Sequence, residues 1–90
     1  MFFKSVDKKL KEVGFEKVSE NKYGCRYCRH GDKNNYNQIV NISLKPDGEL
    51  LLWSYNVDLF SSKKIGNTNI ALTFYEVELF YKKMKELRRK

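Results

Sequence analysis

Two cysteines and the single histidine of the chain lie close together, at Cys25, Cys28 and His30. Zinc prefers thiolate and imidazole ligands, and a Cys-x-x-Cys pair can carry redox chemistry. Residues 23 to 30 alternate as in a strand, however, and positions 25 and 28 of a strand point to opposite faces. A zinc site also needs a fourth ligand, and a redox pair needs a helix N-terminus beside it. We therefore predict two free cysteines, no metal and no other cofactor.

Acid–base or nucleophilic catalysis requires a base placed beside an acid or a nucleophile. No carboxylate is predicted to lie near His30. The acidic residues of the two expected helices, among them Asp7, Glu12, Glu76 and Glu78, take capping or solvent-facing positions. The sequence therefore predicts a protein that is not an enzyme.

Positive charge is a stronger feature of the chain. Lys and Arg number 18 against 11 Asp and Glu, which gives a net charge of +7 and favours binding to nucleic acid or acidic proteins. Basic residues fall into three groups: Lys22, Arg26 and Arg29 on or beside a strand; Lys63 and Lys64 in a loop; and Lys82, Lys83, Lys85, Arg88, Arg89 and Lys90 at the C-terminal helix end. The alternative for the last group is that it complements the helix dipole and keeps the helix end solvated.

Aromatic residues suggest a second kind of site. If Arg26 shares a sheet face with Trp53 and Tyr55, the three side chains form a stacking platform with a cation beside it, as in proteins that hold single-stranded nucleic acid. The alternative is that Trp53 and Tyr55 are buried beneath a loop or in a dimer interface. The register of the strands decides which residues share a face.

That register is predicted by the turn at residues 46–48. Pro46 presets φ for a type I turn, and Gly48 supplies the left-handed residue of a three-residue hairpin. Strands over 36–45 and 49–55 then pair with Lys45 opposite Glu49, and each further pair follows. One face is aliphatic and should be the core side: Val40, Ile42, Leu44, Leu50 and Leu52. The other face is polar and aromatic: Asn41, Ser43, Leu51, Trp53 and Tyr55.

The remaining segments have their own signals. A helix is expected to begin at Ser5, as N-cap, and to stop at Gly14, with strands following over 15–20 and 23–30. Residues 56–69 are predicted to form a long loop, in which 57–60 could add a short edge segment. Thr73 and Glu76 form a capping box, which predicts a second helix. Its buried stripe is expected to be Val77, Phe80, Tyr81, Met84 and Leu87.

These elements predict one α+β domain over residues 1–90, in the order helix, four strands, helix. The strands should form an antiparallel meander sheet, with the N- and C-terminal helices packed on one face. No run of about 18–20 apolar residues could span a membrane, and charged residues occupy the position of a signal peptide. We therefore expect a cytoplasmic protein that makes no membrane contact.

Three stretches carry a resemblance to a known group of proteins: Lys22-Tyr23-Gly24, the alternating strands after it, and Leu72-Thr73-Phe74-Tyr75-Glu76 leading into Lys82-Lys83-Met84-Lys85-Glu86-Leu87. In these stretches the chain resembles small uncharacterised proteins encoded by phages and prophages of Firmicutes. The resemblance covers most of the chain and transfers no catalytic or binding residue. It implies a prophage setting, in which small proteins commonly bind host proteins or nucleic acid.

We therefore expect a non-enzymatic binding module that engages a protein partner or forms a homodimer. The contact surface would be the polar-aromatic sheet face, the long loop, or both. The alternative is a nucleic-acid-binding protein that uses the basic strand residues and the basic C-terminal helix end. The residues expected to contact a partner or nucleic acid are Arg26, Arg29, Asn41, Trp53, Tyr55, Lys63, Lys64, Lys82, Lys85, Arg88 and Arg89.

Overall fold

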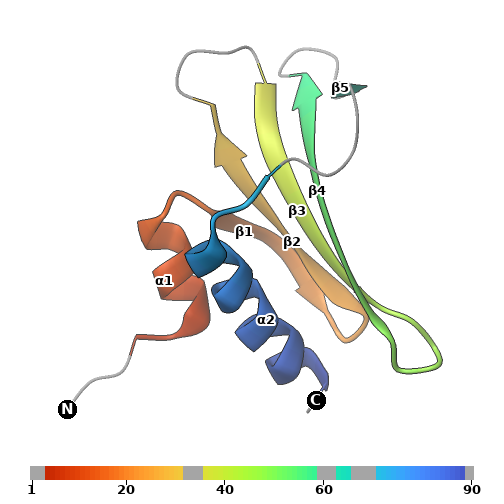
Figure 1. Ribbon diagram of the computed structural model, residues 1–90. Coiled ribbons are helices and arrows are strands. Elements are labelled where there is room, and N and C mark those ends of the chain that lie inside the picture. Colours follow the sequence, from red (N-terminus) through yellow and green to blue (C-terminus); the bar gives the residue numbers. More distant parts are fainter. Residues whose placement is uncertain (1–3, 32–35, 59–62, 66–70, 89–90) are drawn as a thin grey trace.

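The computed structural model describes residues 4–31, 36–58, 63–65 and 71–88. The elements are α1 (Val6–Glu12), β1 (Glu16–Asn21), β2 (Gly24–His30), β3 (Tyr36–Leu44), β4 (Leu50–Asp58), β5 (Lys64–Ile65) and α2 (Phe74–Arg88). The strands form one antiparallel sheet in the order β1-β2-β3-β4-β5, and both helices lie on the same side of it (Figure 1). The predicted α+β fold, with its antiparallel meander from β1 to β4, is confirmed. No helix in these ranges is long and apolar enough to cross a membrane.

The helix ends follow the predicted capping signals. The backbone N–H of Lys8 donates to Ser5 Oγ at 3.1 Å, and Gly14 follows α1 with a φ of 98°. The capping box of α2 is also formed: the Glu76 N–H donates to Thr73 Oγ1 at 3.1 Å, and the Thr73 N–H donates to Glu76 Oε1 at 2.9 Å. These contacts satisfy backbone donors that a helix leaves unpaired at its start.

The β3–β4 hairpin has the predicted register. Gly48 adopts a φ of 89°, its N–H donates to the Lys45 carbonyl at 2.9 Å, and the Lys45 N–H donates to the Glu49 carbonyl at 2.8 Å. Asn41 lies opposite Trp53, as expected. The predicted end of the fourth strand, at residue 55, was wrong. β4 continues to Asp58 because residues 56–58 pair with the start of β3.

The long loop predicted over 56–69 is therefore shorter. Its first three residues belong to β4, and Lys64–Ile65 form β5, which pairs with Asn56 and Val57. The expected edge segment at 57–60 is not the extra strand, since residues 57 and 58 are part of β4. Residues 59–62 and 66–69 lie outside the described residues.

The core fills the space between the helices and the sheet. Phe80 of α2 lies at its centre and meets Phe15 and Tyr27 edge-on, with ring centroids 5.2 and 5.5 Å apart. Such edge-to-face contacts are favoured by the ring quadrupoles. The buried members are Leu10, Phe15, Cys25, Tyr27, Val40, Ile42, Leu79, Phe80 and Leu87, with Leu50 and Leu52 packed against them. The predicted core side of the hairpin is thus the side that the helices cover.

The buried stripe of α2 differs from the prediction. Val77 and Tyr81 are 42% and 57% exposed, whereas Glu76 and Lys83 are each only 4% exposed. The buried face keeps the helical spacing but is rotated toward these two charged residues, because each has an ion-pair partner inside the fold. Hydrophobic periodicity does not detect a face that contains paired charges.

Candidate functional site

The sheet has one face that no helix or strand of the described ranges covers, and we call it the open face. It lies opposite the side on which α1 and α2 pack (Figure 1). The strand register brings its residues into rows: Arg26, Asn41 and Trp53 are direct neighbours, and so are Cys28, Ile39 and Tyr55. The open face therefore has the composition that was predicted for it.

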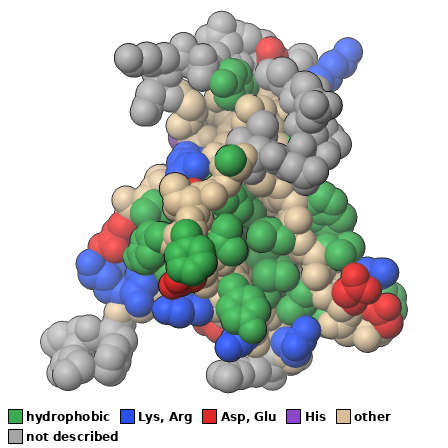
Figure 2. All heavy atoms as spheres, in the orientation of Figure 1, with side chains coloured by type: hydrophobic (Ala, Val, Ile, Leu, Met, Phe, Trp, Pro, Cys, Tyr) green, Lys and Arg blue, Asp and Glu red, His purple; other side chains and the backbone are tan. Residues whose placement is uncertain are grey.

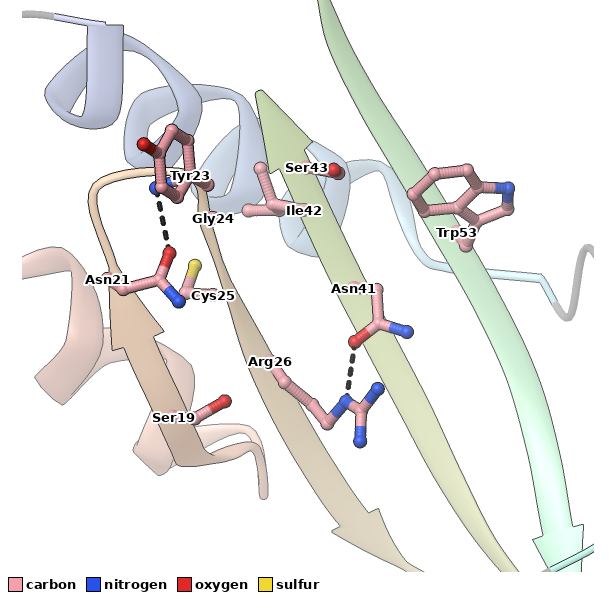
Figure 3. Close-up of a pocket in the computed structure, with 10 residues that line it drawn as sticks. All are labelled: Ser19, Asn21, Tyr23, Gly24, Cys25, Arg26, Asn41, Ile42, Ser43 and Trp53. Atoms are coloured by element: carbon pink, nitrogen blue, oxygen red, sulfur yellow. Dashed lines mark hydrogen bonds between the residues drawn. The ribbon is translucent and has the colours of Figure 1, made fainter. Parts of the chain in front are cut away.

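A chain of hydrogen bonds fixes side chains on the open face. Arg26 Nε donates to Asn41 Oδ1 at 2.8 Å, and Asn41 Nδ2 donates to the Tyr55 hydroxyl at 2.8 Å. The three residues come from β2, β3 and β4. Figure 3 shows Arg26 and Asn41 joined in this way on the side of the sheet away from the helices. We call this set the open row; it holds the guanidinium in place while Arg26 remains exposed.

A hollow of about 320 Å³ lies beside the open row, with Trp53 and Ser43 among its lining residues (Figure 3). Gly24 contributes no side chain to it. A Cβ at this position would lie 2.1 Å from the Ile42 carbonyl oxygen, and the φ of Gly24 is 155°. Only glycine fits this close approach of two strands. Trp53, which is 39% exposed, stands at the border of the hollow.

Arg29 lies on the other face. Its Nη1 contacts the Val13 carbonyl and a carboxylate oxygen of Glu76, and its Nη2 donates to Gln38 Oε1 at 2.7 Å. The guanidinium carbon also lies 4.2 Å from the centre of the Phe15 ring. Gln38 Nε2 donates in turn to Ser54 Oγ at 2.7 Å, so that Arg29, Gln38 and Ser54 form a covered row. The structure thus separates Arg29 from the other predicted contact residues.

The other predicted basic residues do not join the open row. Lys82, Lys85 and Arg88 are exposed on α2, on the helix side of the molecule. Lys63 is exposed next to β5, where its carbonyl accepts from the Asp58 N–H. Lys64 is part of β5, but its side chain lies outside the described residues, as does all of Arg89. The basic groups are therefore divided between the two sides of the sheet.

One member of the basic C-terminal group is structural. Lys83 Nζ lies 2.7 Å from Glu20 and 3.4 Å from Asp7, and its side chain is 5% exposed. Asp7 also accepts from the Tyr27 hydroxyl and from Lys17 Nζ. Asp7 was expected at a capping or solvent-facing position. It does lie in the first turn of α1, but its side chain is only 31% exposed because it joins this cluster. The helical spacing of Lys83 with Phe80 and Leu87 was the available signal for its burial.

The carboxylates of Glu76 and Asp7 are held ionised. Burial alone would raise the pKa of Glu76, but the Thr73 N–H and the Arg29 guanidinium lower it overall below its usual value of 4.5. The pKa of Asp7 is lowered in the same way: burial opposes ionisation, and the Tyr27 and Lys17 hydrogen bonds outweigh it. Burial, together with the bond to Asp7, raises the pKa of Tyr27. These groups are fixed in their ordinary charge states, as structural ion pairs are.

The two cysteines lie on opposite faces of β2. Cys25 is a buried, free cysteine on the core side, and Cys28 is a half-buried, free cysteine on the open face. Burial raises the pKa of both thiols, which disfavours the reactive thiolate. His30 Nδ1 lies 2.9 Å from Asn37 Oδ1. Within the described ranges, no three His, Cys, Asp or Glu residues are grouped so that they could hold a metal ion.

Comparisons of this chain with protein-family models, with curated proteins and with solved structures found no match.

Proposed function

We propose that this chain is a non-enzymatic binding module that engages a protein partner through the open face. One observation carries the proposal: the exposed Trp53 stands beside an open row of Arg26, Asn41 and Tyr55, on a sheet face that the described elements leave uncovered. Trp, Tyr and Arg are the residues that contribute most to binding energy in protein interfaces. The resemblance of the chain to phage and prophage proteins supports a host protein, inside the cell, as the partner.

The open face combines apolar area with fixed polar groups. Ile39 and Leu51 are partly exposed beside the aromatic residues. The open row holds its donors in one geometry before a partner arrives, so that less side-chain entropy is lost on binding. The hollow beside Gly24 could receive a side chain from the partner. These features fit a moderately apolar protein surface with acceptors for Arg26.

A protein partner is favoured over nucleic acid by the placement of the charges. Of the strand side chains that the structure describes, Arg26 is the only Lys or Arg on the open face. Binding to a nucleic-acid strand depends on several phosphate contacts beside the stacking residues. Lys82, Lys85 and Arg88 lie on the helix side, where they could not contact phosphates of a strand stacked on Trp53.

The test compares two double variants for retention of proteins from a Firmicute extract. Arg26→Glu with Trp53→Ala alters the open face, and Lys82→Glu with Lys85→Glu alters the helix side. We expect one protein, identified by mass spectrometry, to be retained by the wild type and the helix-side variant and lost by the open-face variant. Retention unaffected by the open-face changes would contradict the proposal.

A second measurement addresses nucleic acid directly. Mixed single- and double-stranded oligonucleotides are titrated at low and at near-physiological salt. We expect no binding at the higher salt concentration. Submicromolar binding that weakens steeply with salt would instead support the nucleic-acid alternative.

A further inference from the structure

Arg26 of the open row keeps most of its hydrogen-bonding capacity for a ligand. A guanidinium donates through Nε and through both Nη atoms, and the Nε–H of Arg26 is taken by Asn41. Within the described ranges its Nη groups form no hydrogen bond and no ion pair. The contact with Asn41 holds the guanidinium against the sheet while the residue stays exposed. The Nη groups are therefore a fixed pair of donors, and this geometry matches the oxygens of a carboxylate.

The covered row shows that such an arrangement binds a carboxylate. Arg29 has the same kind of neighbours as Arg26, an amide on β3 followed by a hydroxyl on β4. Its Nη1 contacts the Glu76 carboxylate, and this pair joins β2 to the start of α2. Asn41 and Gln38 thus hold an arginine on either face of the same sheet. Since the described elements place no carboxylate against Arg26, a matching one would come from a binding partner.

The hollow beside the open row is polar and carries no negative charge in its described lining. Its side chains include Ser19, which lies opposite Arg26 on β1, and Ser43 on β3. No Asp or Glu of the described residues lines it. Glu16 lies toward the far end of β1, and Glu20 forms its ion pairs on the helix side. Hydroxyl donors beside an arginine favour an anionic group, and the net charge of +7 favours acidic partners.

The site consists of described residues at one end of the sheet. It lies beside the turns that join β1 to β2 and β3 to β4. The internal segments outside the described residues adjoin the other end, at His30, Tyr36, Asp58 and β5 (Figure 1). Past β5 the described chain resumes just before Leu72, which packs against the core on the helix side. The open row is thus reached from the face away from the helices (Figure 3).

We infer that the open row binds an acidic side chain, Asp or Glu, of the protein partner. The carboxylate accepts from the Nη groups of Arg26 and lies in the hollow beside it. The inference rests on the proposed function, since the partner supplies the acidic residue. Tyr23 and Trp53, which are 61% and 39% exposed, border the hollow on two sides (Figure 3). Aliphatic neighbours of the acidic residue can therefore pack on their rings.

A side-chain carboxylate fits this site better than the carboxylate at a chain end. Chain ends are captured in nests of backbone N–H groups. Here β2 and β3 have a neighbouring strand on both sides, so that their backbone groups are used within the sheet. The donors that remain are side chains, as in the contact of Arg29 with Glu76.

Nuclear magnetic resonance of the isotope-labelled full chain tests the inference with two peptides. Acetyl-Leu-Glu-Leu-amide carries one side-chain carboxylate, and acetyl-Leu-Gln-Leu-amide is its neutral match. We expect the Glu peptide to shift the Arg26 Nε–H signal and the indole signal of Trp53, the one Trp of the chain, with millimolar affinity. The Gln peptide should bind about tenfold more weakly. Equal affinity for both peptides, no shift at tens of millimolar, or tighter binding by inorganic phosphate or by the Gln peptide with a free C-terminal carboxylate overturns the inference.

Variants of Arg26 separate a specific contact from general attraction by charge. An acidic peptide drawn by charge alone would favour the helix side, where Figure 2 shows Lys and Arg side chains around the helices. Arg26→Gln should weaken binding of the Glu peptide about tenfold, and Arg26→Lys, which keeps the charge but not the paired donors, about threefold. Lys82→Gln removes the same charge from the helix side and should leave the affinity unchanged. Equal weakening by Arg26→Gln and Lys82→Gln overturns the inference.

Retention of the protein partner distinguishes this inference from the proposed function. If the open-face double variant loses the partner but Arg26→Gln retains it undiminished, the proposed function stands and the carboxylate contact is overturned. If the Glu peptide binds the row as expected but the wild type retains no partner, the carboxylate site stands and the proposed function fails. We expect Arg26→Gln to reduce retention of the partner and Lys82→Gln to leave it unchanged.

Discussion

Two rows with the same chemistry cross the sheet on its opposite faces. Each has an arginine on β2, an amide on β3 and a hydroxyl on β4, joined by hydrogen bonds of 2.7 to 2.8 Å. The open row is Arg26, Asn41 and Tyr55, and the covered row is Arg29, Gln38 and Ser54. The covered row differs in its further contacts, of which the most important joins Arg29 to the buried carboxylate of Glu76 at the start of α2. The same side-chain types thus attach a helix on one face and remain available to a partner on the other.

The covered face depends on having all of its charges paired. In the part of the chain that the structure describes, every buried side-chain nitrogen and oxygen has a hydrogen-bond partner. Lys83 links α2 to Glu20 of β1 and to Asp7 of α1, and Arg29 links β2 to Glu76 of α2. Removing the partner of Glu76, or the partners of Lys83, leaves a buried charge unpaired. Substitutions should therefore cost stability on the covered face and binding on the open face.

The largest difference is expected between the two arginines. Arg29→Ala leaves the Glu76 carboxylate buried without its cation and should lower the free energy of unfolding by about 3 kcal/mol or more. Arg26→Ala removes one exposed hydrogen bond and should cost less than about 1 kcal/mol. Urea denaturation of the two variants measures both values. Equal losses would mean that the covered row is no more structural than the open row.

A smaller loss is expected at Gly24, which lines the hollow beside the open row. Gly24→Ala brings a Cβ against the Ile42 carbonyl, and the required shift of β2 or β3 should cost about 2 kcal/mol. Gly48→Ala is the matched control: its φ of 89° is equally unsuited to alanine, but nothing lies within 4 Å of the new Cβ. We expect about 1 kcal/mol there, measured by thermal denaturation. A larger loss at Gly48 would contradict the steric role given to Gly24.

The two amides of β3 should differ less than the arginines. Gln38→Ala deprives Arg29 and Ser54 of a shared partner inside the fold and should cost about 1–2 kcal/mol. Asn41→Ala should cost only about 0.5 kcal/mol, since water can replace its hydrogen bonds to Arg26 and Tyr55. The comparison is made by urea denaturation, with retention of the protein partner as a second readout. Loss of retention with Gln38→Ala, and not with Asn41→Ala, would reverse the roles given to the two faces.

Acid should weaken the contact between Arg29 of the covered row and Glu76. The pKa of Glu76 is lowered by folding, so its contribution to stability is fully present above about 4.5, its usual pKa, and is lost as the pH falls through the lower folded value. Glu76→Gln should reduce this acid loss, while Asp7 retains its own share. Arg26→Ala should leave the acid loss unchanged. The measurement is the free energy of unfolding between neutral pH and pH 3; an acid slope unchanged in Glu76→Gln would contradict the assignment.

Local features were predictable because their causes lie within a few residues. The turn at Pro46-Asp47-Gly48 sets the hairpin register through its own backbone conformation, and this register places Asn41 opposite Trp53. The capping box of Thr73 and Glu76 spans three residues. From these signals the α+β fold and the membership of the open face could be derived.

The burial of charged residues was decided only by the tertiary structure. Arg29 pairs with Glu76, which lies 47 residues away in the sequence, and Lys83 pairs with Asp7, which lies 76 residues away. Strand alternation separates Arg29 from Arg26, and helical spacing sets Lys83 with Phe80 and Leu87. The cost of burying a charge depends on partners far along the chain, however, so neither pattern shows that Arg29 or Lys83 is covered.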